Sequence, residues 1–97
     1  MINFSIIGGA GWRAEFYFRI AAALPGRFRV AGALVRDAAK AEALRRKWGV
    51  ATFDNLDSLL ASDKPAFVVT SVPVAPNAAF LRELAGRRVP VLSETPP

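Results

Sequence analysis

The 97-residue chain contains no cysteine and no histidine. Without cysteine it has no disulfide framework, no thiolate nucleophile and no thiolate metal site. Without histidine it lacks the commonest general base and the commonest transition-metal ligand, so Ser71 has no activating partner. Asp54 and Asp57 resemble a metal pair only superficially, and we interpret them as helix-capping residues. The sequence therefore predicts no metal site and no catalysis by a cysteine, a histidine or an activated serine.

Long apolar runs are absent as well. The longest one is far shorter than the ~20 residues that span a membrane, and no signal-peptide pattern opens the chain. We therefore expect a cytoplasmic protein with no membrane contact, folded as one domain over residues 1–97. Apolar residues make up 53% of the chain, which exceeds the ~45–50% usual for soluble domains. This surplus predicts apolar surface that meets a partner, for example in a homo-oligomer.

The net charge of +5 raises nucleic-acid binding as an alternative function. The basic residues, however, fall at predicted helix ends, strand edges and turns, with acids between them, and they build no single stripe. Arg45, Arg46 and Lys47 suit the negative end of a helix dipole. We interpret the positive charge as solvated surface and expect no nucleic-acid partner.

Strand-like and helix-like segments alternate along the whole chain. The predicted strands cover 2–7, 28–35, 50–53, 66–71 and 89–93, and the predicted helices cover 12–24, the segments after Asp37 and Asp54, and about 75–85. Short connections between alternating elements indicate an α/β fold with parallel strands. Right-handed crossovers then give a doubly wound, Rossmann-type sheet of five strands in the order 3-2-1-4-5. Ligands of such sheets bind beyond the carboxyl ends of the strands, at the switch point between strands 1 and 4.

Spacing and capping residues define the predicted helices. In the first helix, Phe16, Ile20 and Leu24 are spaced four apart, which places them on one apolar face. The second helix is predicted to begin after an Asp37 cap and to end at Gly49. Its predicted buried stripe is Ala41, Leu44 and Trp48. The third helix is expected to open with two carboxylates, Asp54 and Asp57.

A glycine-rich turn, Gly9-x-Gly11-x-x-Ala14, follows the first predicted strand and opens a helix. Gly9 allows a tight turn, Gly11 lets the backbone approach a pyrophosphate, and Ala14 lets the helix pack close to the strand. The first N–H groups of the helix offer donors and a positive dipole end to phosphate. A merely structural turn is the alternative, but the strand-to-helix context favours dinucleotide binding.

The chain resembles the N-terminal NAD(P)-binding domain of Gfo/Idh/MocA-type oxidoreductases, which act on sugars, inositols and related compounds. The resemblance covers essentially the whole chain and is carried by the segments at 6–14, 30–37, 71–73 and 94–96. It implies that Gly9 to Arg13 line the pyrophosphate and that Ser71 to Pro73 flank the nicotinamide-side ribose. It also implies that Glu94, expected as the only acid near the cleft, reaches that ribose or the nicotinamide amide.

Two positions depart from the family pattern. Thr95 stands where the family usually has a lysine that helps to bind substrate and nicotinamide, and Asn77 stands where a histidine is frequent. The chain's lysines, Lys40, Lys47 and Lys64, are expected to lie away from the cleft. We therefore predict no catalytic residue in this chain, which would bind a small-molecule substrate only through a further domain and be inactive alone. The alternative is a non-catalytic nucleotide-binding or assembly module that has lost the lysine.

The end of the second predicted strand bears on the choice between NAD and NADP. A carboxylate there binds the ribose hydroxyls of NAD, but the position is Val35. Arg36 follows and can bind a 2′-phosphate or stack on adenine, so the sequence slightly favours NADP. A solvated Arg36 is the alternative. The predicted cofactor-binding residues are Gly9, Ala10, Gly11, Trp12, Arg13, Arg36, Ser71, Val72, Pro73, Asn77, Glu94 and Thr95.

Overall fold

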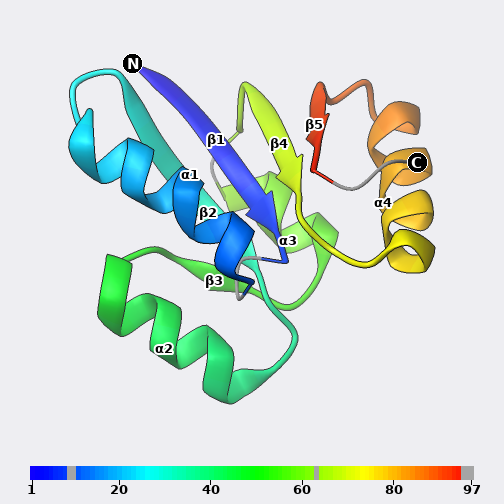
Figure 1. The fold of residues 1–97 in the computed structure, drawn as a ribbon. Coiled ribbons are helices and arrows are strands. Elements are labelled where there is room, and N and C mark those ends of the chain that lie inside the picture. Colours follow the sequence, from blue (N-terminus) through cyan, green and yellow to red (C-terminus); the bar gives the residue numbers. More distant parts are fainter. Residues whose placement is uncertain (9–10, 63, 95–97) are drawn as a thin grey trace.

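The chain folds into a five-stranded parallel sheet with helices on both faces (Figure 1). The structure, a computed structural model, describes residues 1–8, 11–62 and 64–94, without the side chains of Trp12 and Ser62. Its elements are β1 (Ile2–Ile7), α1 (Trp12–Ala23), β2 (Phe28–Leu34), α2 (Ala38–Trp48), β3 (Thr52–Phe53), α3 (Leu56–Ser62), β4 (Phe67–Thr70), α4 (Val74–Gly86) and β5 (Val91–Ser93). The strand order is β3-β2-β1-β4-β5, and each neighbouring pair is parallel. The predicted doubly wound, Rossmann-type fold is confirmed.

Each face of the sheet carries its own apolar core. Phe4 and Ile6 of β1 and Val69 of β4 belong to the core that α1 and α2 cover. Ile7, the residue after Ile6, and Val68, the residue before Val69, belong to the core that α3 and α4 cover. Because successive side chains of a strand alternate between faces, a nearly continuous apolar strand can supply both cores.

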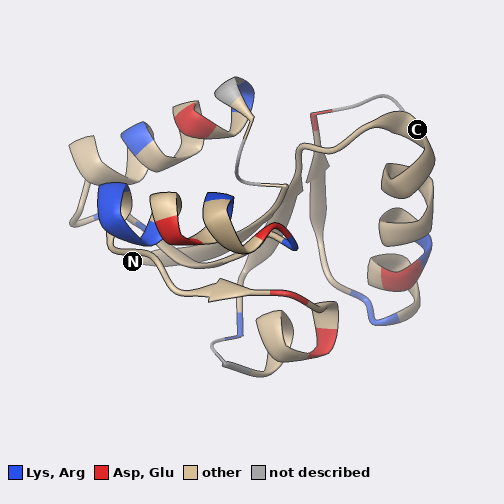
Figure 2. Ribbon diagram, turned by 90° about the horizontal axis from the view of Figure 1, so that it is seen from below, with Lys and Arg blue, Asp and Glu red and all other residues tan. Residues whose placement is uncertain are grey.

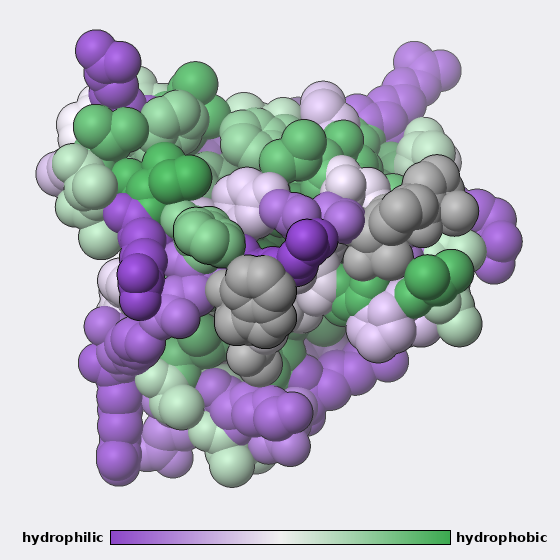
Figure 3. Space-filling view, viewed as in Figure 1, coloured by the Kyte–Doolittle hydropathy of each residue, from purple (hydrophilic) through white to green (hydrophobic). Residues whose placement is uncertain are grey.

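The buried face of α1 differs from the prediction. Phe16, Ile20 and Leu24 are 57%, 44% and 43% exposed, whereas Ala14 and Phe18 are 0% and 2% exposed. Ala14 and Phe18 belong to the core between α1 and the sheet, so the row of Phe16, Ile20 and Leu24 lies on the exposed side of the helix. In Figure 3 apolar atoms gather over α1 and the neighbouring sheet, while the region of α2 is mainly polar. The row of three residues predicted from spacing is therefore exposed, and another row of α1 packs on the sheet.

The ends of α2 agree with the prediction. Oδ1 of Asp37 accepts hydrogen bonds from the backbone N–H groups of Ala39 and Lys40, at 3.0 and 3.1 Å. Gly49 ends the helix with φ of +64°, a left-handed conformation that favours glycine. Ala41 and Leu44 are buried and Trp48 is half-buried, as predicted.

The start of α3 corrects the prediction that Asp54 caps it. Oδ1 of Asn55 accepts from the backbone N–H of Ser58 at 2.8 Å, so the capping side chain is the next residue. Oδ1 of Asp54 instead accepts from Nδ2 of Asn55. Both are good capping types, and the choice between them depends on where β3 ends.

Positive and negative residues are interspersed along the helices and turns (Figure 2). Lys47 of α2 pairs with Glu15 of α1, which holds the two helices of one face together. Arg46 pairs with Glu42 within α2 at 3.0 Å. Within the described ranges, no helix is both long and apolar enough to cross a membrane.

Candidate functional site

The loops after β1 and β4 touch at Gly8. This glycine has φ of +85°, and a Cβ there would collide with the carbonyl oxygen of Ser71 and with Cγ1 of Val72. Its N–H donates to the carbonyl of Leu34 at 3.0 Å, and the N–H of Ser71 donates to the carbonyl of Ile7 at 2.9 Å. Only glycine meets both the positive φ and the close approach. Gly8 therefore fixes the end of β1 against the end of β4.

A cavity of about 280 Å³ opens where β1, β2 and β4 end. Its walls come from the end of β1, the end of β2 with the start of α2, and the β4–α4 connection. The lining residues are Ile7, Gly8, Leu34, Val35, Arg36, Asp37, Lys40, Val72, Pro73, Pro76 and Phe80. This is the switch point of the sheet, where the strand order reverses between β1 and β4. The geometry brings the predicted Arg36, Val72 and Pro73 together around one cavity.

Two cations border this cavity. Arg36 follows β2, and its guanidinium lies 5.8 Å from the centroid of the Phe80 ring of α4. Lys40, in the first turn of α2, lines the same cavity. The prediction that all three lysines lie away from the cleft was therefore wrong for Lys40. Its position follows from Asp37, because a helix capped there presents its first turn to the end of β2.

An acid also lines the cavity, which corrects the expectation that Glu94 is the only one. Asp37 is part of the lining. One of its carboxylate oxygens already accepts from two backbone N–H groups of α2. Its charge is therefore partly committed to the helix N-terminus.

The N-terminus of α1 differs from that of α2. Its N-cap residue is Gly11, which makes no side-chain capping hydrogen bond. A Cβ added at Gly11 would meet nothing within 4 Å, so the space beside this helix end is open. The first N–H groups of a helix have no partner within the helix, and a phosphate is suited to accept from them.

A polar cluster forms at the end of β5. The hydroxyl of Tyr17 donates to Oε1 of Glu94, and Nη1 of Arg13 lies 3.5 Å from Oε2 of the same carboxylate. The backbone N–H of Glu94 donates to the carbonyl of Thr70 at 2.9 Å. Burial, followed by the hydrogen bond to Glu94 and its charge, raises the pKa of Tyr17 to about 12. The phenol is therefore a hydrogen-bond donor at neutral pH.

Asn77 lies between α4 and β5. Its side chain is fully buried, and Nδ2 donates to Oγ of Ser93 at 3.1 Å. The contact ties the second turn of α4 to the last residue of β5. Ser71 is partly exposed, and its backbone carbonyl lies beside Gly8.

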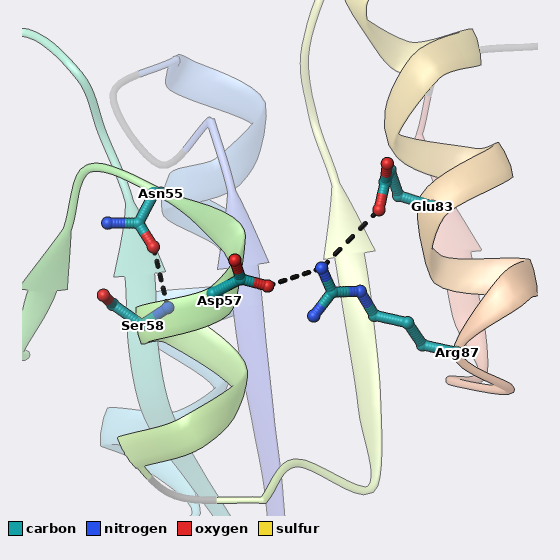
Figure 4. A network of polar contacts seen from close by, with 5 residues as sticks. All are labelled: Asn55, Asp57, Ser58, Glu83 and Arg87. Atoms are coloured by element: carbon teal, nitrogen blue, oxygen red, sulfur yellow. Dashed lines mark hydrogen bonds and ion pairs between the residues drawn. The ribbon is translucent and has the colours of Figure 1, made fainter.

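A second cavity, of about 350 Å³, lies between α3 and α4 and shares Arg36 and Phe80 with the first. Arg87 spans it, with Nη2 2.5 Å from Oδ1 of Asp57 and 3.6 Å from Oε2 of Glu83 (Figure 4). The hydrogen bond to Asp57 raises the pKa of Arg87. Because all three side chains are exposed, this network holds α3 beside α4 only modestly.

Comparison with protein families shows to which family the chain belongs. A family model described as the oxidoreductase family Gfo/Idh/MocA, NAD-binding Rossmann fold, matches residues 2–97. The chain belongs to the Gfo/Idh/MocA family. The matched part is the NAD-binding Rossmann domain of these oxidoreductases. The comparison with curated proteins found no match.

Solved structures share the fold of this Gfo/Idh/MocA domain. The WlbA dehydrogenase from Chromobacterium violaceum, in complex with NADH and UDP-GlcNAcA, has a TM-score of 0.86 and 21% identity, over 98% of this chain and 27% of its own. The myo-inositol 2-dehydrogenase from Lactobacillus plantarum has a TM-score of 0.82 and 18% identity, over 98% and 28%. The UDP-N-acetylglucosamine 3-dehydrogenase GnnA from Acidithiobacillus ferrooxidans has a TM-score of 0.77 and 22% identity, over 95% and 28%. The chain thus spans little more than a quarter of the length of these proteins.

Some predicted site residues of the Gfo/Idh/MocA domain lie outside the described residues. They are Gly9, Ala10 and Thr95, and the side chain of Trp12 is not described either. Their roles stay predictions.

Sequence reasoning missed four residues that border or shape the candidate site: Gly8, Tyr17, Lys40 and Phe80. Gly8 adjoins the recognised motif, and Lys40 follows the recognised Asp37 cap by three residues, so local signals existed for both. Tyr17 and Phe80 meet their partners only through the tertiary fold.

Proposed function

We propose that this Gfo/Idh/MocA domain binds NADP(H) in preference to NAD(H) across the ends of β1, β2, β4 and β5. It serves an oxidoreductase that transfers hydride between nicotinamide and a sugar- or polyol-like substrate. The observation that carries the proposal is the cavity at the switch point, with Gly8 at its floor and two cations, Arg36 and Lys40, at its rim.

The rim of the cavity supports NADP(H). Val35, which is buried and directly follows β2, stands where a carboxylate would bind the ribose hydroxyls of NAD. Arg36 and Lys40 together supply two positive charges, and Arg36 brings a planar fork that suits phosphate. Asp37 opposes them, but its Oδ1 is committed to the cap of α2. The balance favours a ligand with a 2′-phosphate.

The start of α1 suits the pyrophosphate. Gly9 to Arg13 are the residues that would line it, and Gly11 provides an open helix end without a side-chain cap. Gly8, the last described residue before this segment, is held against Ser71 at the start of the β4–α4 connection. A pyrophosphate placed there would extend from the adenosine cavity towards β5.

The ends of β4 and β5 would then receive the nicotinamide half. Ser71 to Pro73 would flank the ribose, and Glu94 would accept a hydrogen bond from a ribose hydroxyl or from the amide. Asn77 would contribute indirectly, because its side chain donates to Ser93, the residue before Glu94. The bound nicotinamide supplies the carbon that accepts or donates hydride.

The substrate class rests on the family and on the names of its structural neighbours, which include an inositol dehydrogenase and a UDP-N-acetylglucosamine 3-dehydrogenase. Oxidation of a carbinol also requires a base for the hydroxyl proton. The described residues offer no histidine or lysine beside Glu94, and Thr95 carries no charge. We therefore expect this chain alone to bind cofactor without catalysing hydride transfer.

Titration of the chain with NADPH and NADH tests the proposal, with the fluorescence of its two tryptophans as the signal. We expect saturable binding of both, tighter for NADPH. Absence of saturable binding by either dinucleotide would refute the cofactor role. Equal affinity would refute only the preference for NADP(H).

The alternative is a non-catalytic nucleotide-binding or assembly module. The exposed row of Phe16, Ile20 and Leu24 on α1 favours it, because such a row suits a protein interface. Light scattering over a range of concentrations tests this alternative. A chain that stays monomeric would argue against the assembly module. If the complete protein also turned over no substrate, nucleotide binding would be the remaining function.

A further inference from the structure

Tyr17 and Glu94 are joined across 77 positions of the sequence by a hydrogen bond from the phenol to Oε1. Tyr17 belongs to the middle of α1, whereas Glu94 directly follows β5. The bond therefore links the helix that begins at the glycine-rich turn with the strand end at the opposite side of the site. No local motif predicts such a contact.

The ring of Tyr17 is fixed by the sheet beneath it. It packs edge-on against Phe4 of β1, with centroids 6.4 Å apart and planes at 68°. Phe4 in turn stacks on Phe67 of β4, with centroids 5.2 Å apart and planes at 4°. A tyrosine has only two side-chain torsions to restrain, so this packing orients its hydroxyl at low entropic cost.

Glu94 is held at its backbone and at its carboxylate. The backbone N–H donates to the carbonyl of Thr70, which places the residue beside the end of β4. The carboxylate receives Tyr17 on Oε1 and faces Arg13 on Oε2 at 3.5 Å. A carboxylate has about four acceptor sites, so these two contacts leave capacity for a ligand hydroxyl or amide.

We propose that Tyr17 is a positioning residue, which holds the Glu94 carboxylate at the end of β5 so that it accepts a hydrogen bond from the nicotinamide half of the dinucleotide. This inference rests on the proposed cofactor function. Tyr17 contributes orientation only, because its ring packs on the sheet and its hydroxyl is directed to Glu94.

Ligands that lack the nicotinamide-side ribose separate positioning from folding. Calorimetric titrations of the chain would use NADPH, NADH, ADP and adenosine 2′,5′-bisphosphate, of which the last two end before that ribose. We expect Tyr17→Phe to weaken both dinucleotides about tenfold. The affinities for ADP and adenosine 2′,5′-bisphosphate should stay unchanged, because Tyr17 donates to Glu94 and packs on Phe4 and does not line the cavity that Arg36 and Lys40 border.

Glu94→Gln is the matched second variant. If Tyr17 acts through Glu94, Tyr17→Phe combined with Glu94→Gln should bind dinucleotides no more weakly than Glu94→Gln alone. Circular dichroism checks that each variant is folded, and Phe at position 17 retains the packing on Phe4. Glu94→Gln also tests the pair without altering α1, should Tyr17→Phe fail to fold. It must itself weaken dinucleotides more than it weakens ADP, because Arg13 joins Glu94 to the proposed pyrophosphate site.

The outcomes separate the two proposals. If the wild-type chain binds none of the four ligands, the proposed function fails and the positioning role with it. If the wild type binds dinucleotides while Tyr17→Phe leaves their affinity unchanged, only the positioning role is overturned. Equal weakening of ADP and dinucleotides by Tyr17→Phe would likewise overturn it, because the effect would be structural.

Discussion

The guanidinium of Arg36 lies 5.8 Å from the centroid of the Phe80 ring, so a side chain from the segment between β2 and α2 reaches across the cavity to α4. The cation–π contact holds the charge at the rim of the cavity rather than in bulk solvent. Lys40 lines the same cavity from α2. Two cations held at one rim define a position for an anion.

Removal of either cation should weaken NADPH selectively. We expect Arg36→Ala to lower the affinity for NADPH by about tenfold, and Lys40→Ala by somewhat less, because each removes a charge-assisted contact to phosphate. Binding of NADH should change little. Fluorescence titrations measure both, with the exposed Lys64→Ala as control for loss of charge. A parallel loss of NADH affinity would contradict a role at the 2′-phosphate.

Gly8→Ala should destabilise the fold. The substitution adds a Cβ at φ of +85°, where it collides with the backbone of Ser71. We expect a loss of about 2 to 4 kcal/mol in the free energy of unfolding, measured by urea denaturation. Gly26→Ala is the matched control, because a Cβ there meets nothing within 4 Å. Similar stabilities of the two variants would show that the contact between the β1 and β4 loops is soft.

The ionisation of Tyr17 should be observable on its own, because the chain contains one tyrosine. Burial, then the hydrogen bond to Glu94 and its charge, raises the pKa of Tyr17 from 10.0 to about 12. Since the folded pKa is the higher one, the contribution of the phenol to stability is complete below pH 10 and is lost as the pH rises towards 12.

Ultraviolet absorbance of the phenolate measures this transition. Glu94→Gln removes the carboxylate charge and should lower the midpoint, although burial keeps the pKa above its ordinary value. An unchanged midpoint in Glu94→Gln would mean that the hydroxyl does not bond to this carboxylate in solution.

Two phenylalanines of α1 offer a test of which helix face is buried. Phe18 is 2% exposed and stacks on Trp48, whereas Phe16 is 57% exposed. Phe18→Ala should cost about 3 to 5 kcal/mol of unfolding free energy. Phe16→Ala should cost less than about 1 kcal/mol, as is usual for surface positions. Thermal or urea denaturation of both variants measures these losses. A larger loss for Phe16→Ala than for Phe18→Ala would mean that the row of Phe16 is the buried one.

The strand order could be predicted from the sequence, because the order depends on the local pattern of strands and helices and on the handedness of their connections. Apolar strands alternate with helices, and right-handed crossovers then leave few topologies. The caps at Asp37 and Gly49 were equally predictable, since each depends on one residue type at one helix end. The burial of α1 was not, because the row Phe16, Ile20 and Leu24 fits a helical period as well as the true row does.

The place of a cavity at the switch point was predictable from the strand order, whereas several of the residues that border it were not. Arg36, Val72 and Pro73 were expected near the switch point and line its cavity. Lys40 was misplaced because helix residues were considered apart from the cap that orients them. The contacts of Tyr17 with Glu94 and of Arg36 with Phe80 each join elements that meet only in the folded chain. Spacing in the sequence carries no signal for such pairs.

The N-cap residue of α1 is Gly11, which makes no side-chain capping hydrogen bond, whereas the N-cap residue of α2 is Asp37, whose side chain accepts two. A phosphate held at α1 would complete the helix as an aspartate completes α2. Binding of the ligand would then be coupled to the stability of the first turn of α1, because the phosphate would accept the hydrogen bonds that a capping side chain accepts elsewhere.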